Sequence, residues 1–417
     1  MTDFKENPPL IIQRASGSYL YTDQGSMIDA ISSWWCKSLG HGHPAVVAAI
    51  HDQLTRFEHV ISANTTHPTI VELAQELSAI SHRQHVYFAC DGSSAVEIAM
   101  KLAIQASQLK GYTSRKQFIA LKHSYHGETL ATLNVSDLGI YKEPFTHFGM
   151  PCHFLDSIPY VANQADPLWQ SCDPHWCIIL QQLESLKHET YAIIVEPIIQ
   201  GAGGMQCYSA DFLSKLAAWA RLNDIYLIAD EIMTGLGRTG EWLACDHANV
   251  VADMICLSKG LTSGALPLSC VLIDNPIYEL FYHDHTVGRP FLHSHTHSGN
   301  SLAVSAALAT IKTMRSEGIN EQAQQLGDCM RRHFADIVST TGKLTNMRSI
   351  GAVVAADLID PENVRIGYQL AQEAQKRGAL LRPIGNTLYW LPPLNTEHQT
   401  IETLAEITFN SIEAAYK

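Results

Sequence analysis

A lysine and an aspartate each stand at the end of a short apolar run. Lys259 follows Met254–Leu257 after one serine, and Asp230 follows Tyr226–Ala229 directly. Burial of a lysine is costly unless it is paired, deprotonated or covalently used, and desolvation makes its amine a better nucleophile toward an aldehyde. A carboxylate at a strand end can keep the ring nitrogen of a cofactor protonated. The pair predicts chemistry on an aldehyde cofactor; the alternatives are a lysine that only reaches water and a metal site at Asp230 and Glu231.

Two further segments that follow apolar runs carry small, hydroxyl-bearing and aromatic residues. Gly92 and Ser93 begin a strong helical pattern after Val86–Ala89, and Tyr125 follows Phe118–Leu121. Free N–H groups and hydroxyls at a helix N-terminus bind phosphate, and an aromatic ring can stack on a flat cofactor. Taken alone, the first segment fits an ordinary helix cap better, and packing explains Tyr125 equally well. Because ligands bind beyond the carboxyl ends of parallel strands, the four segments together favour one cofactor site.

Two motifs that suggest other kinds of site do not fit their context. Gly235–Gly240 has the glycine spacing of a dinucleotide-binding loop, but Asp230–Thr234 separate it from its strand and no strong helical pattern begins with it. His293, His295 and His297 alternate as metal ligands on an extended segment would, yet no nearby acid or cysteine completes the set. We therefore expect neither a dinucleotide nor a metal ion.

The elements that must hold these residues form an α/β pattern. Short apolar runs alternate with amphipathic helical patterns, as in parallel strands that crossover helices cover on both faces. The runs are Val86–Ala89, Phe118–Leu121, Ala192–Val195, Tyr226–Ala229, Met254–Leu257 and Ser269–Ile273. Ser209 is expected to cap one of the helices. We expect a large domain over residues 46–310 and a smaller α+β domain over residues 1–45 and 311–417, with a strand at Leu388–Leu391.

Composition argues against several classes of function. The chain has 417 residues, of which 46% are hydrophobic, enough for a large core and more than one domain. Its formal net charge of -13 argues against nucleic acid as a partner, because phosphate binding needs clustered lysine and arginine. No apolar stretch is long enough to cross a bilayer, and the first residues lack the pattern of a secretion signal. We expect a cytoplasmic protein that binds neither nucleic acid nor membranes.

Taken in order, the segments resemble the class III aminotransferases of pyridoxal 5'-phosphate (PLP) fold type I. The resemblance covers nearly the whole chain. It rests on Asp91–Glu97, Tyr125–Gly127, Glu196-Pro197, Gly201–Gly204, Asp230–Ile232, Gly235–Gly240, Ser258–Gly260 and Gly299-Asn300. It implies an α/β fold with a mainly parallel sheet, PLP as the cofactor, and the transfer of amino groups.

The resemblance also implies roles for individual residues. Lys259 would carry PLP as a Schiff base, Asp230 would pair with its ring nitrogen, and Tyr125 would border its ring. Gly92 and Ser93 would bind its phosphate. Tyr125 and Lys259 would then also face the substrate.

Part of the site is expected from a second chain, in a homodimer with shared active sites. Thr296 of the partner subunit would reach the phosphate. His295 is also expected at the cofactor, and Ser294 at the substrate. The stretch His293–Thr296 departs from the Gly-Pro pair that precedes the threonine in some relatives.

Three segments resemble the branch of the class that converts 8-amino-7-oxononanoate to 7,8-diaminononanoate in biotin biosynthesis. They are Ser32–Trp35, Glu196–Met205 and Leu381–Gly385, and Met233 stands where many other relatives carry glutamine. Trp34 would line the slot for the substrate chain, and Arg382 would bind the substrate carboxylate through two hydrogen bonds. The implied donor is S-adenosylmethionine, although Asp3–Lys5 offers no counterpart of a donor-pocket tyrosine. Lysine as the donor, and an ω-amine or diamine aminotransferase, stay as alternatives.

Overall fold

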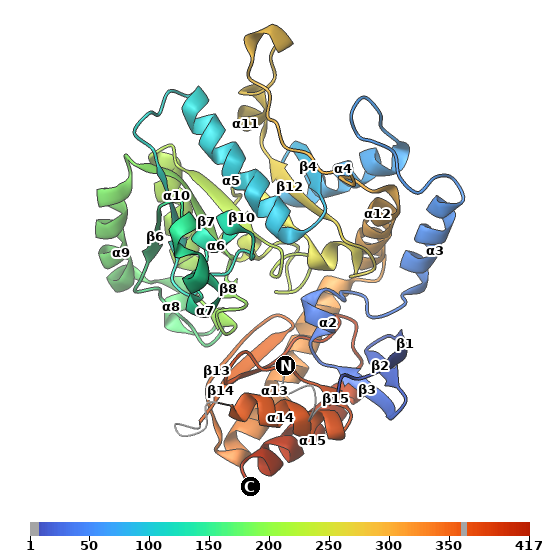
Figure 1. Cartoon of the computed structure of the whole chain (residues 1–417). Coiled ribbons are helices and arrows are strands. Elements are labelled where there is room, and N and C mark those ends of the chain that lie inside the picture. Colours follow the sequence, from blue (N-terminus) through green and yellow to red (C-terminus); the bar gives the residue numbers. More distant parts are fainter. Residues whose placement is uncertain (1–7, 360–364) are drawn as a thin grey trace.

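A seven-stranded sheet forms the centre of the upper part of the molecule in Figure 1, which we call the central unit. The computed structural model describes residues 8–359 and 365–417, so Asp3–Lys5 lies outside the described residues. The strand order is β4-β12-β11-β10-β7-β5-β6. The strands are β4 (His85–Ala89), β5 (Gln117–Leu121), β6 (Cys152–Leu155), β7 (Thr190–Val195), β10 (Tyr226–Asp230), β11 (Met254–Leu257) and β12 (Ser269–Ile273). The predicted α/β fold with a mainly parallel sheet is confirmed.

The six predicted strands are present, with two differences from the expected sheet. β12 runs antiparallel to both β11 and β4, whereas the other pairings are parallel. The chain returns from β11 through a loop that contains the short 3-10 helix η3 (Lys259–Thr262), and such a direct return gives antiparallel pairing. The edge strand β6 was not predicted, because it is only four residues long and mostly half-buried.

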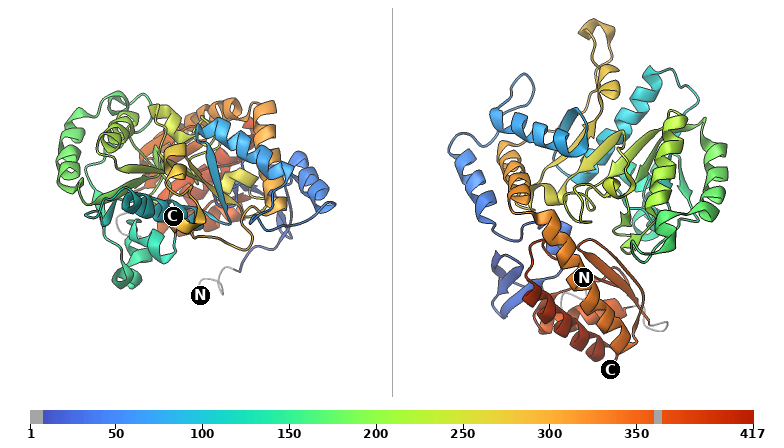
Figure 2. Two further views of the ribbon diagram at one scale, coloured as in Figure 1. Left: turned by 90° about the horizontal axis from the view of Figure 1, so that it is seen from above. Right: turned by 180° about the vertical axis from the view of Figure 1, so that it is seen from behind.

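Helices cover both faces of this sheet, and alternate strand residues point to each of them. Phe118 and Ile194 share an apolar cluster with α5, whereas Ile119 and Val195 belong to the cluster on the other face. The covering helices are α5 (Gly92–Leu109) on the first face, and α4 (Pro68–Ser81), α9 (Asp173–Leu186) and α10 (Ala210–Leu222) on the second (Figure 2). Ser209 caps α10 as predicted, accepting a hydrogen bond from the backbone of Phe212. Among the helices of the described residues, none combines the length and hydropathy that crossing a membrane requires.

The remaining helices of the central unit are shorter or lie at its border. They are α3 (Pro44–Leu54), α6 (Leu130–Asn134), α7 (Gly139–Lys142), α8 (Pro167–Gln170), α11 (Asn275–Glu279) and α12 (Ser301–Ser316), with the 3-10 helices η1 (Glu143–Phe148), η2 (Ala244–Ala248) and η4 (His285–Val287). The residues that join α11 and η4 form an arm that projects from the top of the molecule in Figure 1. α12 leads from this arm toward the lower part.

The lower part of the molecule, which we call the terminal unit, contains segments from both ends of the chain (Figure 1). One sheet contains β1 (Ile12–Ser16), β2 (Tyr19–Thr22), β3 (Gly25–Asp29) and β15 (Ala379–Leu380), and another contains β13 (Leu344–Ile350), β14 (Val353–Leu358) and β16 (Thr387–Trp390). The helices are α13 (Ile319–Thr341), α14 (Ile366–Lys376) and α15 (His398–Ala415). β3 pairs in parallel with β15, and β16 contains most of the strand predicted at Leu388–Leu391. The domain boundaries at residues 46 and 310 stay a prediction.

The glycine-rich segment Gly235–Gly240 of the central unit packs against the terminal unit. Arg238 is buried, and its guanidinium donates a hydrogen bond of 2.7 Å to the carbonyl of Pro392. Gly351 has a positive φ, and a side chain there would place its Cβ 2.2 Å from the carbonyl carbon of Thr239. The glycine spacing therefore serves close packing between the two units.

Candidate active site

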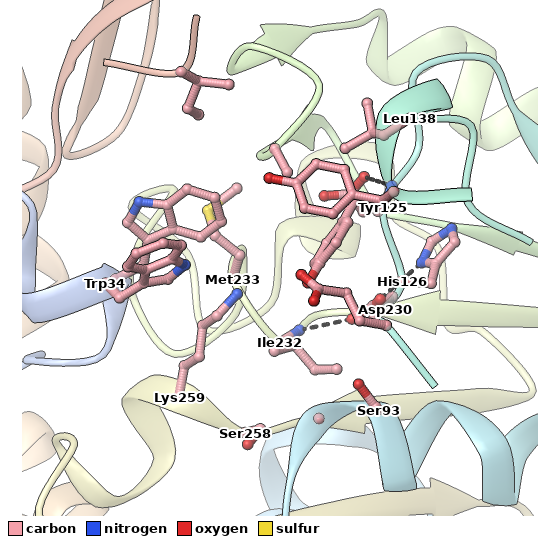
Figure 3. A pocket seen from close by; sticks show the side chains of 18 of the residues that line it. Trp34, Ser93, Tyr125, His126, Leu138, Asp230, Ile232, Met233, Ser258 and Lys259 are labelled. Carbon is pink, nitrogen blue, oxygen red and sulfur yellow. Dashed lines mark hydrogen bonds and ion pairs between the residues drawn. The ribbon is translucent and has the colours of Figure 1, made fainter. Parts of the chain in front are cut away.

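A cavity of about 720 Å³ lies at the carboxyl ends of the parallel strands, where the terminal unit meets the central unit. Predicted site residues that line it are Trp34, Gly92, Ser93, Tyr125, Asp230, Lys259 and Arg382. In Figure 3, Trp34 and Tyr125 lie on opposite sides of the space into which Lys259 points. The carboxyl ends of β4, β5, β10 and β11 bring most of these residues together, because parallel strands end at a common edge.

Lys259 and Asp230 come from neighbouring strands. Asp230 is the last residue of β10 and lies opposite Cys256 in β11, three residues before Lys259. Burial lowers the pKa of the Lys259 amine, and the carboxylates of Asp230 and Glu196 oppose this effect only in part. The Lys259 Nζ lies 4.6 Å from the centroid of the Trp35 ring. A lowered pKa increases the fraction of unprotonated, nucleophilic amine.

A histidine fixes the orientation of Asp230. His126 Nδ1 lies 2.7 Å from Asp230 Oδ2, and both residues are buried (Figure 3). The backbone N–H of Ile232 donates to the other carboxylate oxygen at 3.2 Å. His126 Nε2 is buried and has no hydrogen-bond partner among the described residues. These contacts hold a carboxylate at the cavity in one orientation.

The first turn of α5 is both a capped helix end and a candidate anion site. Asp91 Oδ1 accepts a hydrogen bond of 2.9 Å from the backbone of Ser94, which is the cap. Gly92 and Ser93 line the cavity, and the N–H groups of a first helical turn lack acceptors within the helix. A Cβ on Gly127 would lie 2.3 Å from the Ser93 hydroxyl, so only glycine permits this approach. The turn is thus open toward the cavity.

A buried glutamate connects two parts of the cavity wall. Glu196 accepts hydrogen bonds of 2.9 Å from the backbone N–H groups of Tyr125 and Gly201, one on each carboxylate oxygen. Burial raises the pKa of Glu196 to about 7, although nearby His126 and both N–H groups lower it. The Tyr125 hydroxyl donates to Glu128 at 2.9 Å, and burial raises the pKa of this tyrosine. Glu196 therefore changes its charge near neutral pH.

Aromatic residues and an arginine form another part of the wall. The guanidinium carbon of Arg382 lies 4.3 Å from the centroid of the Trp34 ring, which is 53% exposed. Trp35 donates a hydrogen bond of 3.0 Å from its indole nitrogen to the hydroxyl of Tyr389. An apolar surface and a cationic group therefore lie side by side.

The structure does not bring Ser294, His295 and Thr296 to the cavity of their own chain. All three precede α12, where Ser294 and Thr296 are exposed and His295 is half-buried. His295 Nε2 lies 3.0 Å from His293 Nε2, and the carbonyl of Thr296 lies 2.8 Å from His59 Nε2. Their expected roles depend on a second chain and stay predictions. Across residues 8–359 and 365–417, no group of three His, Cys, Asp or Glu side chains could hold a metal ion.

Several residues that line the cavity were not among the predicted site residues, and four of them make the contacts described above. Glu196 directly follows β7, so the strand-end rule that selected Asp230 could have selected it too. His126 lies beside Tyr125 in a segment that had already been singled out. Trp35 and Tyr389 meet across 354 positions of sequence, and no local signal predicts that contact.

The family model for aminotransferase class-III matches residues 2–412. The chain belongs to the class III aminotransferases. A relative from Synechococcus elongatus, named adenosylmethionine-8-amino-7-oxononanoate aminotransferase, is 37% identical to this class III aminotransferase over 407 residues. The match covers 94% of the chain and 92% of the relative.

Solved structures agree with this assignment. The adenosylmethionine-8-amino-7-oxononanoate aminotransferase of Methanocaldococcus jannaschii has a TM-score of 0.91 and 29% identity, covering 99% of this chain and 95% of its own. A PLP-bound amine transaminase from an uncultivated Pseudomonas species has a TM-score of 0.87 and 29% identity, with the same coverage. Class III aminotransferases depend on PLP, and this aminotransferase has the PLP fold type I.

The pKa of Glu196 predicts how the stability of this aminotransferase changes with pH. The value is about 7 in the folded protein, against an ordinary 4.5, so the folded state binds this proton more tightly. The resulting stabilisation is complete below the ordinary pKa and is lost as the pH rises through about 7. We expect Glu196→Gln to lower the free energy of unfolding of the cofactor-free protein at pH 5, where wild type has this stabilisation. At pH 8, where wild type has lost it, the decrease caused by the substitution should be smaller by roughly 1–3 kcal/mol.

Urea unfolding at the two pH values measures this difference. The control is Glu189→Gln, which removes a half-exposed carboxylate paired with Lys116. Its effect on the free energy of unfolding should be the same at both pH values. If Glu196→Gln lowered the free energy of unfolding by the same amount at both pH values, the raised pKa would be contradicted.

Proposed function

We propose that this aminotransferase transfers an amino group to 8-amino-7-oxononanoate, giving 7,8-diaminononanoate, with PLP bound in the cavity. The relatives from Synechococcus elongatus and Methanocaldococcus jannaschii are named for this acceptor and match nearly the whole chain. The observation that carries the proposal is the contact between Trp34 and Arg382 at the cavity. A long apolar acid needs an apolar wall and a cation that binds its carboxylate, and this pair offers both.

The residues around the cavity fit PLP. Its phosphate would lie at the first turn of α5, where Gly92 and Ser93 present donors and Gly127 leaves room. The carboxylate of Asp230 would bind the protonated ring nitrogen, and Lys259 would bind the aldehyde carbon. When bound, PLP supplies an aldehyde that takes up and returns the amino group, and a ring that withdraws electrons from the reacting carbon.

The side chains of this chain would divide the work of the reaction. Lys259, with its lowered pKa, would bind the cofactor and, once released, carry a proton to and from the reacting carbon of the substrate. Asp230 would keep the ring nitrogen protonated, and His126 would keep Asp230 oriented. Tyr125 would border the ring from the side opposite Trp34.

The amino donor proposed here is S-adenosylmethionine. This choice is supported by the names of the relatives from Synechococcus elongatus and Methanocaldococcus jannaschii, both of which include adenosylmethionine. Lysine is the alternative. Mixing the PLP form of the enzyme with each donor distinguishes them, because only the true donor converts the cofactor to its amine form.

Lys259→Ala should abolish both transamination and the visible absorbance that arises from the Schiff base between Lys259 and PLP, because the covalent link and the proton carrier are lost together. Absorbance spectra and a transamination assay measure the two effects. Lys122→Ala is the matched control, since Lys122 follows β5 but does not line the cavity. If Lys259→Ala retained both properties, this assignment would be wrong.

Arg382→Ala should raise the KM for 8-amino-7-oxononanoate. The resulting fall in kcat/KM should correspond to a loss of about 2–5 kcal/mol in transition-state stabilisation. The donor half-reaction should be nearly unchanged, because it does not use this cation. Arg377→Ala, which removes a surface arginine paired with Glu373, should alter neither half-reaction.

Two outcomes would contradict the proposed acceptor. Equal damage to both half-reactions in Arg382→Ala would indicate a structural role for the arginine. A wild-type enzyme that aminates simple ketones without a carboxylate as well as it aminates 8-amino-7-oxononanoate would favour an ω-amine aminotransferase.

We further propose that the enzyme is a homodimer with shared active sites. The support is the projecting arm and the loop that follows it, where Tyr282 is 66% exposed and Leu292 is 78% exposed (Figure 1). Exposed apolar side chains gathered on one projection are typical of an interaction surface. Thr296, exposed in the same loop, would then reach the cofactor phosphate of the other subunit.

Thr296→Ala should raise the Kd for PLP about tenfold, the loss expected for one hydrogen bond to a charged group. Thr286→Ala is the control, because Thr286 lies in η4, directly after the arm, and its hydroxyl bonds to Asp284. Titration with PLP gives the Kd, and sedimentation gives the oligomeric state. A monomer that binds PLP as tightly as the dimer would argue against shared sites.

A further inference from the structure

Four consecutive residues, Ser32–Trp35, have a left-handed backbone, and the last two of them line the cavity. Their φ angles are 51°, 44°, 75° and 72°. Trp35 N donates to the carbonyl of Ile31 at 2.8 Å, and Cys36 N donates to that of Ser32 at 3.0 Å, so the residues close one left-handed turn. None of the four is glycine, and a Cβ at positive φ crowds the backbone carbonyl. Other contacts must therefore hold this turn in place.

The carboxylate of Asp29 holds the turn through Ser33. Asp29 Oδ1 accepts a hydrogen bond of 2.9 Å from the backbone of Ser33, and Oδ2 accepts one of 2.7 Å from the Ser33 hydroxyl. His41 Nε2 lies 2.8 Å from the same Oδ2. Burial opposes the charge of Asp29, but the bonds from His41 and Ser33 outweigh it and lower its pKa. Asp29 is therefore a buried carboxylate that stays charged.

The segment around the turn also bonds to both units of the molecule. The Ser32 hydroxyl donates to the carbonyl of Leu391 at 2.7 Å, after strand β16 of the terminal unit. The Ser38 hydroxyl donates to the carbonyl of Gly260 at 3.2 Å, directly after Lys259. The turn is thus fixed relative to the reactive lysine and to the terminal unit.

The turn determines where two indole rings stand. Trp34 contacts the guanidinium of Arg382, and Trp35 lies 4.6 Å from the Lys259 Nζ. Asp29 and His41 are buried behind the turn and are not among the described residues that line the cavity. They can act on a substrate only through the turn.

We propose that Asp29, assisted by His41, is the positioning residue that sets the slot for the acceptor chain by holding Ser32–Trp35 in its left-handed turn. The inference rests on the proposed function, because the occupant it implies is a long unbranched amino-keto acid. Loss of the Asp29 charge would release Ser33 and shift Trp34 relative to Arg382. Long acceptors would then bind poorly, whereas short ones that never reach Trp34 would not be affected.

Asp29→Asn tests the proposal, because the amide keeps nearly the same shape and loses the charge. The KM for 8-amino-7-oxononanoate should rise about tenfold, a change of about 1.4 kcal/mol. The KM and kcat for a short aldehyde such as propanal should stay within about twofold. The near-ultraviolet circular dichroism of the cofactor-free protein should change in the indole bands, because the Trp34 ring moves, whereas the hydrogen bond to Tyr389 holds Trp35 beside Lys259.

The matched control is Asp357→Asn. Asp357 also has a lowered pKa and pairs with a buried cation, Arg348, at 2.8 Å, but it does not line the cavity. It should lower stability without changing the KM ratio of the two acceptors or the indole bands. His41→Leu should reproduce Asp29→Asn in weaker form, and it serves as the test if Asp29→Asn does not fold.

Two results would overturn the proposal: an equal rise in KM for both acceptors, or indole bands that match wild type. Failure of the proposed function is distinguishable from this. A wild-type enzyme inactive with 8-amino-7-oxononanoate would refute the acceptor, while the indole bands of Asp29→Asn and Asp357→Asn would still decide whether Asp29 holds the turn.

Discussion

The site depends on keeping an amine and a carboxylate at the same edge of one sheet. Parallel pairing of β10 with β11 places Asp230 and Lys259 at neighbouring strand ends. Burial lowers the pKa of the lysine, which suits a nucleophile. Contacts from His126 and from the backbone of Ile232 hold the carboxylate of Asp230 in one orientation. The edge therefore holds two buried polar groups whose costs the surrounding fold offsets.

The residues proposed to bind the cofactor and those proposed to bind the substrate come from different parts of the molecule. Asp230 ends β10 and Lys259 follows β11 in the central unit, whereas Trp34 and Arg382 follow β3 and β15 of the terminal unit. The relative position of the units therefore sets the distance between Lys259 and Arg382 across the cavity. The buried guanidinium of Arg238, bonded to a carbonyl of the terminal unit, is one contact that fixes it.

Four consecutive left-handed residues place backbone strain beside the cavity. Left-handed conformation costs about 1–2 kcal/mol for each residue that is not glycine. The four residues Ser32–Trp35 therefore carry a cost that a surface loop would relieve by refolding. Such strain persists only where surrounding contacts determine the conformation, and it is common at functional sites. Here Asp29 and Leu391 supply those contacts from two separate segments, and Gly260 binds Ser38 a few residues after the turn.

The sequence by itself determined six of the seven strands of the central sheet and the residues that follow them, because both depend on local order. Apolar runs mark buried strands, and the edge rule then selects Asp230, Lys259, Tyr125 and the first turn of α5. Only the tertiary structure decided the antiparallel direction of β12, the contact of Trp35 with Tyr389, and the left-handed turn at Ser32–Trp35. Each of these depends on partners far away in the sequence, and a propensity for positive φ is absent from serine and tryptophan. The buried network around Asp29 imposes that conformation, and no local pattern of residue types predicts it.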